Sequence, residues 1–143
     1  MIEIERVKKS SQEIIDALNN LLPQLGADSV MNESLLTQIV SQENVYLFVA
    51  RKDGEIVGTL SLTMYPIPTG LKAWIEDVIV DENCRGFGIA RKLVDRAIHR
   101  AKERNVVSLS LSSRPERVAA NKLYQSMNFK IRDTNLYRYD SQK

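Results

Sequence analysis

The chain of 143 residues is poor in the residues that build disulfides and metal sites. It contains one cysteine, Cys84, and one histidine, His99. A single cysteine excludes an internal disulfide, and these two residues are too few for a zinc site, which takes four ligands. The acidic residues also lack the spacing of a metal-binding loop. We therefore expect no bound metal.

Long apolar runs and an excess of one charge are lacking too. No uninterrupted apolar stretch reaches membrane length, and the chain does not open on an apolar leader. Twenty basic residues stand against 18 acidic ones, a net charge of +2, which gives no preference for polyanions. We expect a cytoplasmic protein with neither a membrane nor a nucleic-acid partner. Its length suits a single domain, residues 1–143.

The most informative stretch runs from Trp74 to Arg104. Its first part, Ile75–Val80, is β-branched and apolar around two acids, which predicts a buried strand. Its last part repeats apolar residues at helical spacing, at Ala90, Leu93, Val94, Ala97, Ile98 and Ala101. Gly86 and Gly88 lie between them. A strand that enters a helix through such a turn directs backbone N–H groups at one point, which predicts a phosphate-binding site.

This glycine turn does not match the common nucleotide-binding patterns. Arg91 occupies the third glycine position of a dinucleotide fingerprint, and no Walker lysine pattern is present. The pattern Arg85-x-x-Gly88-x-Ala90, between an acid-containing strand and an amphipathic helix, instead resembles the Arg/Gln-x-x-Gly-x-Gly/Ala signature of the GCN5-related N-acetyltransferase (GNAT) family. The alternative is a glycine turn that only joins strand to helix.

A second stretch near the end of the chain carries the same resemblance. Ala120–Phe129 is similar to the family's Ala-x-x-Leu-Tyr-x-x-x-Gly-Phe stretch. Asn128 replaces the glycine, and asparagine tolerates the left-handed backbone that ends many helices. Arg117 stands where the family often has asparagine. In the family, a side chain near this position contacts the bound cofactor. The replacement leaves open which side chain does so here, and Asn121, one turn further on, is the candidate.

The remaining patterns predict an alternation of strands and helices. Ser10-Ser11 and Asn32 predict helix N-caps, and Asp53-Gly54 predicts a hairpin. The prolines of Tyr65–Gly70 predict a protruding connection outside the ladder. Ser112–Pro115 predicts the start of the last helix. We expect strands near residues 2–6, 45–50, 55–64, 74–80, 106–111, 129–131 and 136–139, and helices near 12–22, 33–40, 90–104 and 115–127.

This order of elements predicts an α/β (α+β) fold. We expect a single mixed, mostly antiparallel central sheet flanked by helices, which is the acyl-CoA N-acyltransferase fold of the family. The resemblance implies acetyl-CoA as co-substrate, an amine as acceptor, and direct attack in a ternary complex. It also implies that the loop Gln24–Asn32 forms a wall of the acceptor pocket, and Tyr65–Gly70 is a candidate lip over it.

The cofactor residues follow from the two parts of acetyl-CoA. The pyrophosphate is expected at the backbone N–H groups of Arg85, Gly86, Gly88, Ala90 and Arg91. Pantetheine is expected to pair like an added strand with Val78, Ile79 and Val80, where a backbone N–H can also hold the thioester oxygen.

Glu76 and Tyr124 are the candidate catalytic residues. An amine with a pKa of about 10 arrives protonated, so a base must remove a proton before attack. Strand alternation predicts Trp74, Glu76, Val78 and Val80 on one face and Ile75, Asp77 and Ile79 on the other. Either acid can serve as base, and the resemblance favours Glu76. Tyr124 is the candidate acid that protonates the departing sulfur.

Two questions stay open at this level. A chain with the same turn can be a non-catalytic acyl-CoA-binding sensor or interaction module instead of an enzyme. The acceptor can be a small-molecule amine or a protein or peptide amine, and the protein can be a monomer or a homodimer.

Overall fold

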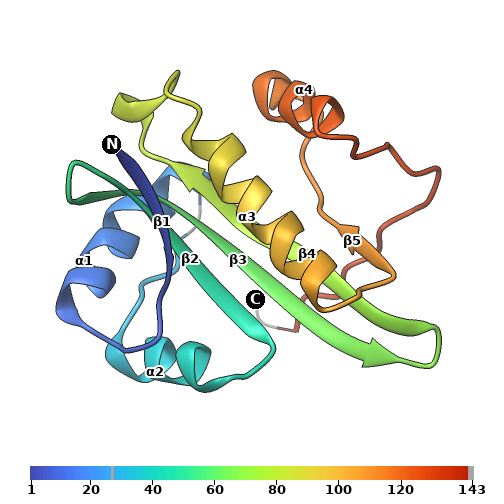
Figure 1. Cartoon of the computed structure of the whole chain (residues 1–143), viewed down its shortest axis with the longest axis horizontal. Helices are drawn as coiled ribbons and strands as arrows, with labels where there is room; N and C mark the ends of the chain where they lie inside the picture. The colour runs from blue at the N-terminus through green and yellow to red at the C-terminus, as the bar shows by residue number, and fades with distance from the viewer. Residues whose placement is uncertain (27, 142–143) are drawn as a thin grey trace. The chain divides into compact units, whose positions relative to one another are not determined.

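The computed structural model describes residues 1–26 and 28–141, which form two compact units, Met1–Ser112 and Ser113–Lys143. The first unit contains β1 (Ile2–Arg6), α1 (Gln12–Leu21), the 3-10 helix η1 (Leu22–Leu25), α2 (Glu33–Ser41), β2 (Val45–Lys52), β3 (Glu55–Ile67), β4 (Gly70–Val80), the 3-10 helix η2 (Glu82–Cys84), α3 (Ile89–Glu103) and β5 (Ser108–Ser110) (Figure 1). The second unit contains α4 (Val118–Ser126). One domain over the whole chain stays a prediction.

One five-stranded sheet organises the first unit. Its strand order is β1-β2-β3-β4-β5, with antiparallel pairing from β1 to β4 and parallel pairing between β4 and β5. The predicted single mixed, mostly antiparallel sheet is therefore confirmed. β5 is shorter than the predicted strand over residues 106–111.

Local signals in the sequence place the early helices and the hairpin correctly. The Ser11 side chain accepts a hydrogen bond from the Ile14 N–H at 3.3 Å, and Asn32 accepts one from Leu35 at 2.8 Å, so both predicted N-caps are confirmed. Asp53 has a left-handed φ of 52°, as a two-residue hairpin turn requires.

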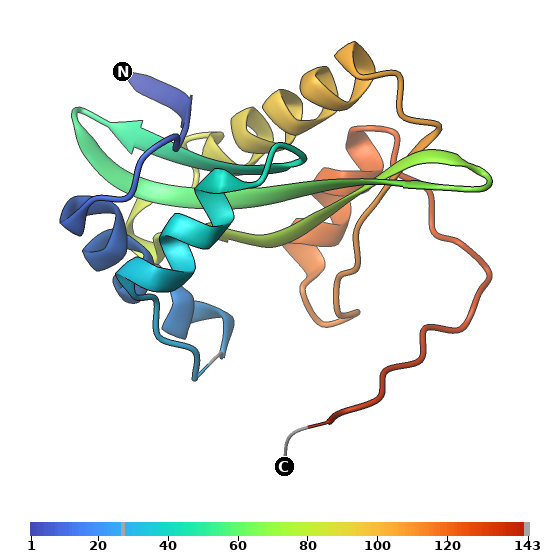
Figure 2. The same cartoon turned by 90° about the horizontal axis from the view of Figure 1, so that it is seen from below.

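Helices cover both faces of this sheet. On one face α3 buries Ile89, Leu93, Val94, Ala97 and Ala101. On the other face α1 and α2 pack against Leu47 and Val49 of β2. Figure 2 shows α3 on one side of the sheet and α1 and α2 on the other. The predicted helical stripe is confirmed except that Ala90 and Ile98 are half-buried and Ile89 is buried instead.

The predicted break at Tyr65–Gly70 is wrong. β3 and β4 stay paired through Pro66↔Leu71 and Ile67↔Gly70, and only Pro68 and Thr69 form the turn. The ladder tolerates Pro66 because β2 ends opposite Thr63, so the outer edge of β3 at Pro66 needs no N–H donor. The candidate lip is therefore the tip of a long hairpin.

In the second unit, α4 begins three residues later than the predicted start at Pro115. The Asn121 side-chain amide donates to the carbonyl oxygens of Arg114 and Arg117, both at 2.8 Å, and this holds the preceding residues in a turn. The helix ends as expected, with Asn128 at a φ of 73°.

The two strands predicted after α4 are wrong for the described residues. Residues 129–131 and 136–139 carry no ladder, and the apolar residues there are exposed, Ile131 by 83%, Leu136 by 75%, Tyr137 by 87% and Tyr139 by 91%. An alternating sequence suits a strand, but a strand also needs a neighbour for its N–H and C=O groups.

Candidate active site

The turn at the start of α3 has the geometry of an anion-binding site. Gly86 and Gly88 have left-handed φ values of 89° and 75°. Gly88 is the N-cap of α3, and because it has no side chain it cannot itself cap the first backbone N–H groups of the helix. A Cβ placed on either glycine meets no described atom within 4 Å, so the space at both Cβ positions is open. The predicted residues Arg85, Gly86, Gly88, Ala90 and Arg91 all lie in this turn or in the first turn of α3.

The segment that joins β4 to this turn is held by short hydrogen bonds. The Asp81 N–H donates to the Val57 carbonyl oxygen at 2.8 Å, and the Asp81 carboxylate caps η2 by accepting from the Asn83 N–H at 3.0 Å. The Cys84 N–H returns to the Asp81 carbonyl oxygen at 2.8 Å. The glycine turn therefore starts from a defined position at the end of the sheet.

The edge of β4 next to this turn has no strand beside it in the described part of the chain. β5 pairs with Lys72, Ala73 and Trp74, and its ladder ends there. From Ile75 to Val80, the described residues pair with β4 on the β3 side alone. The predicted pantetheine residues Val78, Ile79 and Val80 lie on this edge, where an extended amide-bearing ligand can take the place of a strand.

A bulge in β4 changes which side chains share a face. Ser61 of β3 lies opposite Glu76 and Thr59 lies opposite Ile79, so two residues of β4, Asp77 and Val78, face one of β3. Asp77 has a left-handed φ of 52°.

The predicted alternation is therefore wrong beyond Asp77. Glu76 and Ile79 share the face of Ser61 and Thr59, because cross-strand partners lie on the same face. Val80 lies opposite Gly58, on the face that α3 covers.

Glu76 is exposed but partly desolvated. Partial burial raises the pKa of its carboxyl group, and the neighbouring Asp77 carboxylate raises it further. A carboxylate with a raised pKa is a stronger base at neutral pH than an ordinary glutamate.

The connection between α1 and α2 reaches the end of β4. η1 packs against β4, and the Gln24 side-chain oxygen accepts a hydrogen bond from the Glu82 N–H at 3.1 Å. The predicted acceptor wall, Gln24–Asn32, therefore begins close to the strand that carries Glu76. Residue 27 of this wall lies outside the described residues.

Tyr124 and Asn121 belong to the second unit. Tyr124 is buried on α4 and packs edge-to-face on Phe129, with ring centroids 6.1 Å apart. Burial raises the pKa of its hydroxyl, and the nearby Arg117 charge opposes that rise. Tyr124 is therefore protonated at neutral pH, as a proton donor must be. The Asn121 amide nitrogen is engaged by the two backbone carbonyls before α4.

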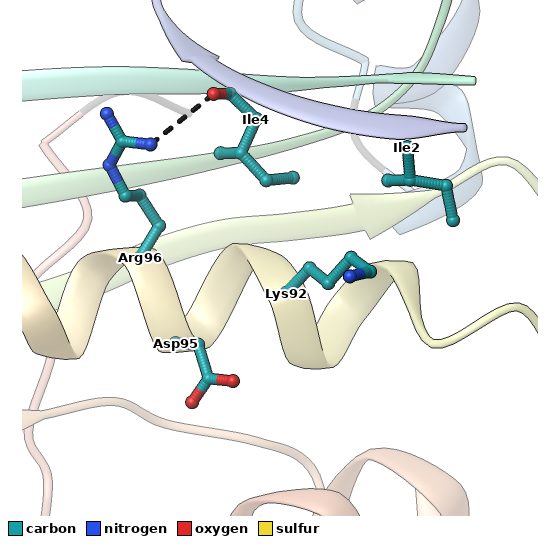
Figure 3. Close-up of a pocket in the computed structure, with 5 residues that line it drawn as sticks. All are labelled: Ile2, Ile4, Lys92, Asp95 and Arg96. Atoms are coloured by element: carbon teal, nitrogen blue, oxygen red, sulfur yellow. Dashed lines mark hydrogen bonds between the residues drawn. The ribbon is translucent and has the colours of Figure 1, made fainter. Parts of the chain in front are cut away.

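Other surface features lie apart from these residues. A groove of about 350 Å³ between β1 and α3 is lined by Ile2, Ile4, Lys92, Asp95 and Arg96 (Figure 3). Arg96 donates to the Ile4 carbonyl oxygen across it, at 3.4 Å. A second groove, between α1 and the β2–β3 hairpin, is lined by Glu13, Ala17, Asn20, Leu21, Gly54, Glu55, Ile56 and Asp81. Neither groove is lined by a predicted site residue.

The described residues also contain no group of three or more His, Cys, Asp or Glu side chains that could hold a metal ion. Within the same residues, no helix combines the length and apolarity needed to cross a membrane.

One contact at the glycine turn was not foreseen. Phe87 is the residue between the two turn glycines in the sequence. The Lys52 ammonium lies 4.2 Å from the centroid of the Phe87 ring. The residues are 35 positions apart, and no local pattern in the sequence connects them.

Comparisons with known proteins bear on the family and the fold. The sequence model of the acetyltransferase (GNAT) family matches residues 12–129. The chain is 36% identical over 69 residues to N-alpha-acetyltransferase 30 of Saccharomyces cerevisiae, a match that covers 48% of this chain and 39% of that protein. The chain thus spans about two-fifths of the length of this curated relative.

Solved structures share the fold over nearly the whole chain. A putative acetyltransferase of Agrobacterium tumefaciens has a TM-score of 0.84 at 23% identity, covering 96% of this chain and 99% of that one. An aminoglycoside acetyltransferase from an uncultured soil sample has a TM-score of 0.86 at 22% identity, and the match covers 99% of this chain and 97% of that one. A transcriptional regulator of Bacillus halodurans has a TM-score of 0.79 at 27% identity, and the match covers 98% of this chain and 100% of that one.

Proposed function

The chain belongs to the acetyltransferase (GNAT) family, and from this membership we propose that it is an acetyl-CoA-dependent N-acetyltransferase acting on a primary amine. The observation that carries the proposal is the glycine N-cap at the start of α3, directly after an edge of β4 that has no strand beside it among the described residues. These two features suit the two ends of one ligand, a pyrophosphate and an extended pantetheine chain.

The cofactor residues of this proposal lie in one continuous stretch. Backbone N–H groups of Arg85, Gly86, Gly88, Ala90 and Arg91 hold the pyrophosphate at the positive end of α3. Val78, Ile79 and Val80 pair with pantetheine and bring the thioester to the bulge. A backbone N–H of this segment stabilises the oxyanion as it forms, a contribution of about 3 kcal/mol in comparable enzymes. Asn121 is the further candidate contact.

The chemistry needs two proton transfers. Glu76 takes a proton from the acceptor ammonium, directly or through water, and the free amine attacks the thioester carbonyl carbon. A C–N bond forms and the C–S bond breaks, so that CoA leaves as a thiolate. Tyr124 gives its proton to this sulfur. The raised pKa of Glu76 supports its part as base, and Asp77 is the alternative base.

The acceptor belongs to one of two classes. The yeast relative is named an N-alpha-acetyltransferase, and one structural neighbour is named an aminoglycoside acetyltransferase. We therefore propose peptide N-termini and amino sugars as the first two classes to screen. The wall at η1 and the long β3–β4 hairpin are the elements through which this chain selects between them.

Calorimetric titration with acetyl-CoA and CoA, followed by a thiol-release assay over these amines, tests the proposal. We expect binding of both ligands and amine-dependent release of CoA. Glu76→Gln should lower kcat by about 10²- to 10⁴-fold while acetyl-CoA binding is kept, as expected for loss of a general base. Tyr124→Phe should lower kcat with the same binding. Absence of acetyl-CoA binding would refute the proposal.

The same fold can also serve a non-catalytic acyl-CoA-binding module. Binding of acetyl-CoA without release of CoA for any amine, and no effect of Glu76→Gln on any activity, would favour that alternative.

A further inference from the structure

Phe87 is an unusual residue for the middle of a phosphate-binding turn. Its side chain is 54% exposed, so the apolar core does not hold it. The glycines on both sides have positive φ values, and glycine is the residue with the widest backbone freedom. A turn of this composition needs an outside contact if its N–H groups are to keep one direction.

Lys52 supplies such a contact. Its ammonium lies 4.2 Å from the Phe87 ring centroid, within the range of a cation–π interaction. Lys52 is the last residue of β2, and its backbone pairs with Ile2 of β1 on one side and with Glu55 of β3 on the other. The next residue, Asp53, binds the N-terminal ammonium at 2.9 Å. The lysine therefore extends from a well-anchored backbone.

We propose that Lys52 is a positioning residue for the cofactor turn. Its ammonium holds the Phe87 ring, and the ring holds the backbone between Gly86 and Gly88 in the conformation that receives the pyrophosphate. Lys52 thus acts on the cofactor through Phe87 and not by touching a phosphate. This inference rests on the proposed function, because it assumes that the turn binds the pyrophosphate of CoA.

A double-mutant cycle tests the inference. The affinity for CoA is measured by calorimetry for wild type, Lys52→Met, Phe87→Leu and the double variant. Each single variant should bind CoA about two- to fivefold more weakly, the scale of one exposed cation–π contact. The double variant should bind no more weakly than Phe87→Leu alone, because both changes remove the same contact.

Three further measurements separate positioning from a general effect. Lys52→Arg should bind CoA as wild type does, since a guanidinium also stacks on an aromatic ring. Lys8→Met, which removes one exposed positive charge after β1, should leave CoA affinity unchanged. Pantetheine, which has no pyrophosphate, should bind wild type and Lys52→Met equally well by ligand-observed NMR.

Each opposite result has a defined meaning. If Lys52→Met weakens CoA binding in the Phe87→Leu background as much as it does in wild type, the lysine contacts a phosphate directly. That result would overturn the positioning role. If Lys52→Met weakens pantetheine binding as much as it weakens CoA binding, the substitution damages the site in general. That result would overturn the positioning role as well. CoA binding by wild type that Lys52→Met does not weaken would overturn this inference alone, whereas no CoA binding by wild type would overturn the proposed function.

Discussion

Asp77, the residue that follows Glu76 at the bulge of β4, disfavours the ionisation of the Glu76 carboxyl group through its charge. Partial burial is the larger cause of the raised pKa of Glu76, and the charge of Asp77 adds to it. The two acids were expected on opposite faces of a regular strand. The two carboxylates are nevertheless coupled, because the charge of Asp77 raises the proton affinity of Glu76.

Asp77→Asn should therefore lower the pKa of Glu76. Asparagine tolerates a left-handed backbone, so the φ of 52° at this position can be kept. The acid limb of the pH profile of kcat/KM, which reports the base in the free enzyme, should move to lower pH. Glu82→Gln, which removes an exposed negative charge after the strand, is the matched control and should not move the limb. An unchanged limb in Asp77→Asn would argue against Glu76 as the base.

Glu76→Gln should make the fold more stable than that of wild type at neutral pH but not at acidic pH. The pKa of Glu76 is higher in the folded chain than in the unfolded chain, where it is about 4.3. The protonated form therefore favours folding below this value, and that advantage is lost as pH rises through the folded pKa. Glutamine carries no charge at any pH and keeps the advantage.

Denaturant unfolding at several pH values measures this difference. The variant and wild type should be equally stable near pH 4, and the variant should be more stable at pH 7. The gain should stay below about 1 kcal/mol, because water reaches and screens this carboxylate. A variant that is less stable than wild type at pH 7 would contradict the raised pKa.

Gly88→Ala should impair both the fold and the cofactor turn. A left-handed φ costs an L-residue about 1–2 kcal/mol, and Gly88 has a φ of 75°. Since a Cβ there meets no neighbouring atom, the loss comes from the backbone and not from a clash. We expect Tm to fall by about 2–4 °C per kcal/mol and the affinity for CoA to fall with it. Gly88→Asn should recover most of the stability, and equal losses in the two variants would contradict this cause.

Gly58→Ala should be destabilising for a different reason. A Cβ at Gly58 would lie 3.1 Å from the carbonyl oxygen of Ile79 and 3.3 Å from side-chain atoms of Ile89 and Leu93. Because the first of these atoms belongs to the backbone of β4, the strand has to shift by a few tenths of an ångström, and the Ile89 and Leu93 side chains of α3 have to move as well. We expect a loss of about 1–3 kcal/mol in the free energy of unfolding, as for other overpacked cores. A variant as stable as wild type in urea would show that α3 can move away from β3 at little cost.

Local chemistry in the sequence was sufficient for much of the fold. Ser11 and Asn32 cap their helices because their side-chain oxygens reach the N–H groups of the first turn whatever surrounds them. The turn glycines and the amphipathic pattern predicted the start of α3, because both are local features of the residues around that start. The fold class followed from such signals taken in order along the chain, and the family from the resemblance of two short stretches to its signatures.

Features that depend on a distant partner were not predictable in this way. Pro66 belongs to a ladder only because β2 has already ended beside it, and residues 129–131 and 136–139 have strand-like sequences without a strand. The bulge at Asp77 follows from the register between two strands, and it decides which side chains share the face of Glu76. Likewise, only the folded chain brings Lys52 to Phe87.

The sequence by itself thus determined the starts of α1, α2 and α3 and the glycine turn, because these depend on contacts within a few residues. Glu76 and Tyr124 stay candidates that the family resemblance suggests. The tertiary structure decided the strand register, the end of the β5 ladder at Trp74 and the electrostatic surroundings of Glu76. These features require backbone groups far apart in the chain to meet, and no short-range preference of the residues involved specifies that meeting.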